Sequence, residues 1–322
     1  MASPDLPAVR APGRDVPAPA AGVRGPGGGP SRSAGGIRAR ELLLDYLQEQ
    51  LGELLREQQR VQSGEADAIH KMRVSTRRLR SALASYRKLL SPEPGRSLRG
   101  ELKWLARVLG AARDAQVMRH RLQDLVASQP PELVLGPVSA RIDEELLTNY
   151  SEAVRIIGSE LAGERYLRTV AGLQDLVAEP AWTAEGTGQD RSAVARMLRR
   201  DRKRLRSRVR LARQETDREA RAEILHEARK DAKRLRYAAE TWRPDGGAAA
   251  ETMMNAAEAL QKILGELQDS VVARALLQRL GSTAGSGENG FTYGRLHAIE
   301  EHRADAAEKQ FRRLWKDFPK LP

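Results

Sequence analysis

The stretch HKMRVSTRRLRSALASYRKLL, residues 70–90, says the most about how this chain folds. It carries seven Lys and Arg side chains, one histidine and no acid. On a helical wheel of about 100° per residue, its basic side chains share one face, and apolar side chains such as Leu79 and Leu83 lie opposite. The pattern predicts a helix that buries an apolar stripe in a bundle and presents a cationic stripe elsewhere.

The same pattern occurs a second time in the chain. HEARKDAKRLRYAAETW, residues 226–242, aligns with residues 70–86 at an offset of 156, so that His70 meets His226 and Arg73 meets Arg229. Downstream, LARVLGAARD (105–114) matches LQKILGELQD (260–269) at an offset of 155, and L-G-x-x-x-D therefore follows both copies. A repeat on this scale indicates an internal duplication.

The hydrophobic pattern is helical from residue 37 onward. Apolar residues at spacings of three and four predict helices over 38–60, 70–90, 101–126, 137–178 (with a break near Gly158 or Gly163), 191–213, 217–243, 250–280 and 291–317. Runs that alternate in the manner of strands are absent from the sequence. We therefore expect an all-α fold of two pseudo-symmetric four-helix bundles that arose by the duplication, the first over about 37–180 and the second over about 190–320.

Composition sets limits on the class of protein. Residues 1–36 are rich in Pro, Gly and Ala and poor in large apolar side chains, so we expect a disordered tail before a domain over 37–320. The chain has no cysteine, which excludes disulfides, thiolate nucleophiles and cysteine metal sites. No run approaches the ~18 apolar residues of a membrane span, so we expect a cytoplasmic protein that does not insert into membranes.

The charge balance points to an anionic partner. The formal net charge is +12 and the pI is about 10.2. Residues 191–213 alone hold eleven basic residues and one acid. A solvated helix face usually mixes signs, because opposite charges four residues apart stabilise a helix and like charges destabilise it. Either acids from neighbouring helices or an external polyanion must neutralise this positive charge. Because basic faces occur in three segments, 70–90, 191–213 and 226–242, we favour an external polyanion.

The candidate anion-binding residues lie on these three basic faces. They are His70, Arg73, Arg77, Arg78, Arg80 and Lys88 in the first copy, Arg196, Arg199, Arg200, Lys203, Arg206 and Arg210 in the helix over 191–213, and His226, Arg229, Lys230, Lys233, Arg234, Arg236 and Tyr237 in the second copy.

The two leading histidines and the two motif aspartates allow more than one role. His70 and His226 could donate to phosphate, or they could be fixed in the fold by hydrogen bonds to Asp114 or Asp269. The aspartates are better suited to orienting an arginine than to catalysis, because an acid acting alone gives no acid–base pair. We predict no catalytic residue, no metal site and no cofactor.

These motifs give the chain a family resemblance. H-x-x-R-x-x-x-R-R-L-R at residue 70 and H-x-x-R-x-x-x-K-R-L-R-Y at residue 226, each followed by L-G-x-x-x-D, resemble the conserved-histidine α-helical domain, or CHAD, over about 37–318. The resemblance implies two related four-helix bundles with a positively charged groove between them, binding of inorganic polyphosphate, and association with polyphosphate granules. Many relatives also carry a CYTH domain, whereas here we expect a stand-alone member with only the tail in that place.

Two other functions compete with polyphosphate binding. A nucleic-acid backbone could take the same charge, but aromatic residues are only 4% of the chain and do not alternate with the basic stripes as a single-strand stacking surface requires. A polyphosphate-processing enzyme would need a carboxylate cluster for Mg²⁺, and the sequence offers none. We therefore expect a non-catalytic polyphosphate-binding protein.

Overall fold

The computed structural model describes residues 39–65, 67–187, 192–283 and 290–319. Within these ranges the chain forms helices and no strand, and the elements in order are α1 (Ala39–Gln62), α2 (Ala68–Ser85), α3 (Pro92–Ala127), the 3-10 helix η1 (Pro131–Leu133), α4 (Val138–Ala162), α5 (Glu164–Ala178), α6 (Ala184–Thr187), α7 (Ser192–Gln214), α8 (Arg218–Ser282) and α9 (Phe291–Lys316). The all-α prediction is confirmed. The predicted tail over 1–36 lies outside the described residues.

Two glycines divide the long helical regions. The predicted break at Gly163 is confirmed, because α4 ends at Ala162 and α5 begins at Glu164. The helices predicted over 217–243 and 250–280 are joined in α8, which bends at Gly247, where φ is 48°. This φ lies in the left-handed region that glycine adopts without steric cost. The second part of α8 (248–282) returns along the first (218–246), so that Arg229 contacts Gly265.

The predicted helix over 70–90 is too long. α2 ends at Ser85, and the chain then turns into α3. The backbone of this turn forms hydrogen bonds with the segment before α6. Thr183 N–H donates to the Leu89 carbonyl at 3.0 Å, and Ser91 N–H donates to the Ala181 carbonyl at 2.8 Å. Lys88 therefore lies in the turn and not on the α2 face where the helical wheel placed it.

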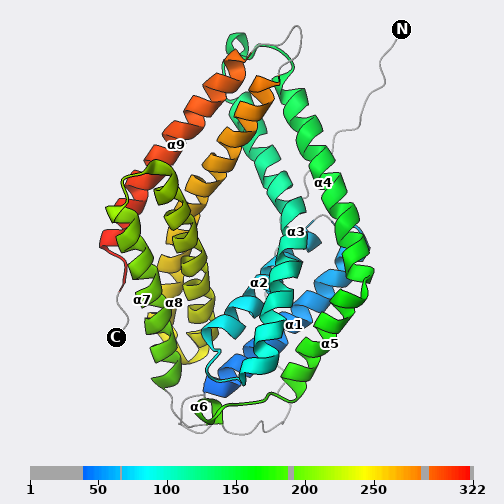
Figure 1. Ribbon diagram of the computed structural model, residues 1–322, viewed down its shortest axis with the longest axis vertical. Helices are drawn as coiled ribbons and strands as arrows, with labels where there is room; N and C mark the ends of the chain where they lie inside the picture. Colours follow the sequence, from blue (N-terminus) through cyan, green and yellow to red (C-terminus); the bar gives the residue numbers. More distant parts are fainter. Residues whose placement is uncertain (1–38, 66, 188–191, 284–289, 320–322) are drawn as a thin grey trace, which may run out of the picture. The chain divides into compact units, whose positions relative to one another are not determined.

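Packing brings the two repeated helices together. α2 packs against α1, α3 and the first part of α8, while α8 also packs against α7 and α9. Figure 1 shows α7, α8 and α9 on the left, with α1 to α5 on the right. The larger hydrophobic cluster joins side chains from both sequence halves, among them Leu79 and Tyr86 of the first and Leu205 and Leu235 of the second. The Tyr86 hydroxyl also donates to the Ala238 carbonyl at 2.9 Å, which fixes the end of α2 against α8.

A second hydrophobic cluster lies at the far ends of α3 and α4. There Leu122 and Ile142 pack with Leu277 of α8 and Leu296 of α9. Beside it Arg121 makes a two-pronged contact with the fully buried carboxylate of Glu300, with distances of 2.7–3.1 Å. Both clusters therefore hold the two sequence halves to each other.

Candidate anion-binding site

The L-G-x-x-x-D motif holds one arginine in each half. Arg73 of α2 donates to the Asp114 carboxylate of α3 at 3.0 Å, and its Nε lies 3.7 Å from the position that a Cβ on Gly110 would take. In the second half the guanidinium of Arg229 lies 3.5 Å from the corresponding position on Gly265. The glycine thus allows the guanidinium to lie against the helix backbone, and the aspartate one turn later orients it by charge.

The two arginines belong to a group of cations that we call the central basic cluster. It consists of Arg73, Arg77 and Arg80 of α2 and Arg229, Lys233 and Arg236 of α8. These are the residues that the sequence repeat pairs at an offset of 156, and the packing of α2 on α8 brings the two sets together. Burial lowers the pKa of Arg77, and the charges of Arg73 and Arg236 lower it further. The charges of one repeat therefore act directly on those of the other.

Lys233 carries the strongest perturbation in this cluster. Burial and, after it, the charges of Arg77, Arg229 and Arg73 lower the pKa of its ammonium group to about 5, although the Asp114 carboxylate opposes the shift. A lysine with this pKa is neutral at pH 7. Burial, reinforced by the neighbouring arginines, therefore disfavours the charged form of this lysine.

Four members of the central basic cluster lack an acidic partner. In the described ranges of the chain, Arg77, Arg80, Arg229 and Lys233 form no ion pair within 4.0 Å. Burial also lowers the pKa of Arg229, although the nearby Asp269 carboxylate raises it. Arg77, Arg80 and Arg229 are thus half-buried charges without an ion pair, and they carry an unfavourable free energy that an external anion would relieve. Lys233 would join them by taking up a proton when the anion binds.

Tyr237 forms the wall of the cluster beside Arg236. Its side chain is buried, and the Arg236 guanidinium lies 5.1 Å from the centre of its ring. The same guanidinium is 3.6 Å from the Glu258 carboxylate and 3.5 Å from the Gln261 side-chain oxygen. Tyr237 therefore shapes the site by packing under an arginine that is already partly compensated.

The two histidines lie at the outer ends of the basic stripes. His70 belongs to the exposed residues, but its side chain is partly covered. This partial burial, together with the charges of Arg113, Arg73 and Arg77, lowers its pKa. Burial and the charge of Lys230 lower the pKa of His226. The alternative in which Asp114 fixes His70 in the fold finds no support, because Asp114 instead accepts from Arg73.

Arg78 and Arg234, also predicted as anion ligands, face the interior between helices. Arg78 pairs with Glu240 at 2.8 Å. Arg234 pairs with the buried Asp201 of α7 at 3.2 Å and donates to the carbonyl of Ala84. Their positions one residue away from the cluster residues turn Arg78 toward Glu240 of α8 and Arg234 toward α7. They already have acidic partners within the chain.

The remaining predicted residues lie away from the central basic cluster. Arg200 of α7 donates to the Ser85 carbonyl at 2.7 Å, and Arg196 is 3.8 Å from Glu185. The other predicted α7 residues, Arg199, Lys203, Arg206 and Arg210, are exposed on that helix, and Lys230 pairs with Glu227 at 2.6 Å. The structure thus separates an α7 surface from the cluster formed by the two repeats, a division that the helical wheels do not show.

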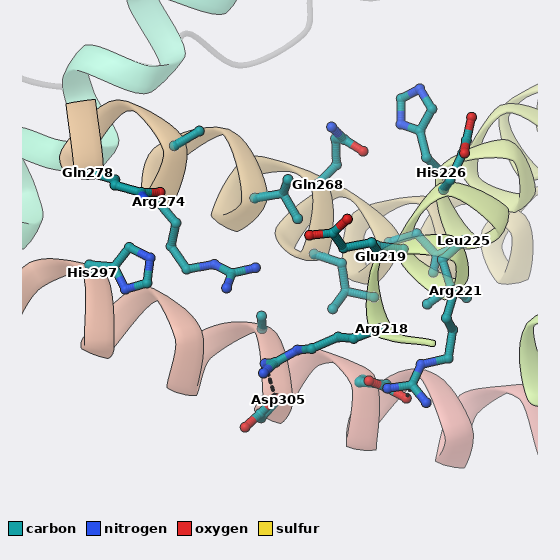
Figure 2. A pocket seen from close by; sticks show the side chains of 18 residues that line it. Arg218, Glu219, Arg221, Leu225, His226, Gln268, Arg274, Gln278, His297 and Asp305 are labelled. Atoms are coloured by element: carbon teal, nitrogen blue, oxygen red, sulfur yellow. Dashed lines mark hydrogen bonds and ion pairs between the residues drawn. The ribbon is translucent and has the colours of Figure 1, made fainter. Parts of the chain in front are cut away.

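A cavity of about 600 Å³ lies between both parts of α8 and α9. Figure 2 shows His226 near one end of it and the ion pair between Arg218 and Asp305 at its edge. Arg218 also pairs with Glu301 at 2.7 Å. Its floor is largely apolar, with side chains such as Leu267 and Val271. Its arginines are mostly engaged with acids of α9, so it has less free positive charge than the central basic cluster.

Metal ligands or a membrane-spanning helix would point to other kinds of site. No group of three or more His, Asp or Glu residues suited to a metal ion occurs among the residues placed by the structure. In the same ranges, each helix is too short or too polar to cross a bilayer.

Comparison with known proteins places the chain in a family. The family model of the CHAD domain matches residues 45–278. The uncharacterized proteins MT2285 and Rv2226, from two strains of Mycobacterium tuberculosis, are each 34% identical over 263 residues, which cover 81% of this chain and 50% of theirs. The chain therefore spans about half the length of these curated relatives.

Solved structures agree with this assignment. The fold is similar to that of PptA from Streptomyces chartreusis, with a TM-score of 0.73 and 20% identity over 87% of this chain and 100% of that one. It is also similar to the crystal structure of the CHAD domain from the plant Ricinus communis, with a TM-score of 0.64 and 26% identity over 89% of this chain and 94% of the other. The chain belongs to the CHAD domain family.

Proposed function

We propose that this protein binds inorganic polyphosphate at the central basic cluster and does not cleave it. The observation that carries the proposal is the meeting of basic side chains from both repeats, four of which form no ion pair within the described chain. Polyphosphate has about one negative charge per phosphate, so a short length of it would compensate several cations at once and release counterions, as a nucleic-acid backbone does. A single small anion would compensate only part of the cluster.

The aspartates in the cluster fit a binding role. Asp114 accepts a hydrogen bond from Arg73, and Asp269 lies beside Arg229 and attracts it. The Asp114 carboxylate thus orients an arginine, which is a different task from activating a water molecule. We extend the proposal to an origin of the site in two duplicated four-helix units, and to association with polyphosphate granules in the cytoplasm.

The proposal is tested by replacing Arg77 and Arg229 with glutamine. Both arginines lack ion pairs in the described chain, so the change removes charge from the site without breaking an ion pair. We expect long-chain polyphosphate to bind at least about tenfold more weakly by isothermal titration calorimetry, because each arginine donates charge-assisted hydrogen bonds to phosphate. Circular dichroism should stay unchanged.

A matched control removes two charges from the exposed face of α9. Lys309 and Arg313 are exposed there and form no ion pair within the described residues, so Lys309→Gln with Arg313→Gln gives the same change in net charge. Equal losses in the two double variants would contradict a specific site. Incubation with polyphosphate and Mg²⁺ tests the second half of the proposal, and shortening of the polymer chains would overturn the non-catalytic role.

A further inference from the structure

We propose that the turn between α2 and α3 forms a second anion site, separate from the central basic cluster, that binds a phosphate group. A hollow of about 220 Å³ lies at this turn. Four cations line it, namely Arg87 and Lys88 from the turn and Arg96 and Arg99 from the start of α3. None of its lining residues is acidic.

The charge in this hollow has little internal compensation. Arg87 and Lys88 are exposed, and neither forms an ion pair within the described part of the molecule. Arg99 donates from Nε only to the carbonyl of Gly95, in its own helix, at 3.2 Å. Arg96 is 3.6 Å from Glu93, and both side chains are exposed, so that pair contributes about 0–1 kcal/mol. At most one of the four cations is therefore partly neutralised.

The backbone of the turn is fixed before any ligand arrives. The Lys88 carbonyl accepts from the Thr183 hydroxyl at 2.5 Å, and the Leu89 carbonyl accepts from Thr183 N–H at 3.0 Å. Leu90 and Trp182 form a β-bridge beside these bonds. A fixed turn keeps the four side chains around one hollow, which lowers the entropy lost when a ligand binds.

The charges of the hollow affect other residues than the charges of the central basic cluster do. Burial lowers the pKa of Arg200, and the charge of Arg87 lowers it further. The charge of Arg87 also lowers the pKa of Arg234, which burial lowers most. Arg200 and Arg234 both lie where α7 contacts α2 and α8. Along α2 the rise of about 1.5 Å per residue places Ser85, its last residue, about 12 Å from Arg77, and Arg87 lies in the turn beyond that end. The two sites are thus distinct, yet one polymer could span them.

This separation has a consequence that rests on the proposed polyphosphate binding. A chain long enough to occupy both sites gains from the high effective concentration of its second contact, whereas a short chain does not. The hollow would therefore make binding depend on polymer length. The hollow itself would bind one phosphate group, and this group can belong either to free phosphate or to a segment of the polymer.

The test uses pyrophosphate, orthophosphate and long-chain polyphosphate as separate probes in calorimetry. Lys88→Gln with Arg96→Gln empties the hollow of two charges whose side chains are exposed, and Lys309→Gln with Arg313→Gln is the control of equal charge. Both pairs are also placed in a background of Arg77→Gln with Lys233→Met, in which the central basic cluster is weakened. Circular dichroism and urea midpoints verify that every variant folds.

In the background that carries Arg77→Gln and Lys233→Met, the hollow variant (Lys88→Gln with Arg96→Gln) should bind pyrophosphate at least about tenfold more weakly. The control pair on α9 should change the affinity for pyrophosphate less than about twofold. For long-chain polyphosphate, the slope of log affinity against log salt should fall by about 2. Equal effects of the hollow variant and the control would overturn the site. If pyrophosphate binding depends on Lys88 and Arg96 but the long polymer does not bind, the second site stands and the proposed function fails. Orthophosphate binding as tight as pyrophosphate binding would assign the hollow to a single phosphate group.

Discussion

Replacing Lys233 with methionine should stabilise the fold and weaken polyphosphate binding at the same time. Lys233 is held neutral in a half-buried position among Arg73, Arg77 and Arg229, with its pKa lowered to about 5. The unfolded chain restores the usual value of 10.5. Methionine has a similar length and no charge to desolvate, so it fits the same space without this cost.

The size of the effect follows from proton linkage. Between pH 5 and pH 10.5 the unfolded chain binds one more proton at Lys233 than the folded chain, so this residue destabilises the fold increasingly as pH falls through that window. At pH 7 the cost is at most about 1.4 kcal/mol multiplied by the 3.5 pH units that separate pH 7 from 10.5, or about 5 kcal/mol. At pH 10 it is at most about 1 kcal/mol.

Urea unfolding at the two pH values measures this directly. Lys233→Met should raise the free energy of unfolding by several kcal/mol at pH 7, with an upper limit of about 5, and by little at pH 10. Lys309→Met on the exposed face of α9 is the control and should change neither value by more than about 0.5 kcal/mol. A gain that does not depend on pH, or a loss at pH 7, would show that Lys233 is not held neutral by its surroundings.

Three other predictions follow from the same contacts. Polyphosphate binding to the wild type should tighten as the pH falls from about 8.5 to about 6, because Lys233 must take up a proton to bind the anion, and Lys233→Met should abolish that part of the pH slope in calorimetry. Asp201→Asn leaves Arg234 buried without its carboxylate and should lower the free energy of unfolding by about 3 kcal/mol in urea titrations; an unchanged value would contradict its role as a buried partner. Gly110→Leu should displace the arginine that lies against this glycine and weaken polyphosphate binding several-fold, whereas Gly100→Leu, with no atom within 4 Å of its Cβ position, should not.

Much of the fold and the centre of the site could be predicted from the sequence. The three- and four-residue spacing of apolar side chains gives the helix class directly, and Gly163 marks a true break. The repeat offset of 156 by itself pairs Arg73 with Arg229 and Arg77 with Lys233. In the structure α2 packs on α8, and the charges of Arg73, Arg77 and Arg229 all act on Lys233.

The rest depends on three-dimensional contacts that a helical wheel does not contain. Arg78 and Arg234 differ from their neighbours only in which helix packs beside them, so their partners Glu240 and Asp201 could not be read from spacing. Lys88 does not lie on the predicted basic face of α2, because the backbone after Ser85 forms hydrogen bonds with residues 181–183. Long-range packing therefore decides which of several similar cations remain available to a ligand.

A competition between long-chain polyphosphate and duplex DNA of equal total charge, across a salt series, distinguishes a polyphosphate site from a merely basic surface. Both polyanions would satisfy a merely basic surface, so their affinities should then be equal at each salt concentration. We predict tighter binding of polyphosphate at physiological salt, with that preference lost in the variant carrying Arg77→Gln and Arg229→Gln. Equal or tighter binding of DNA by the wild type would contradict a site built for polyphosphate.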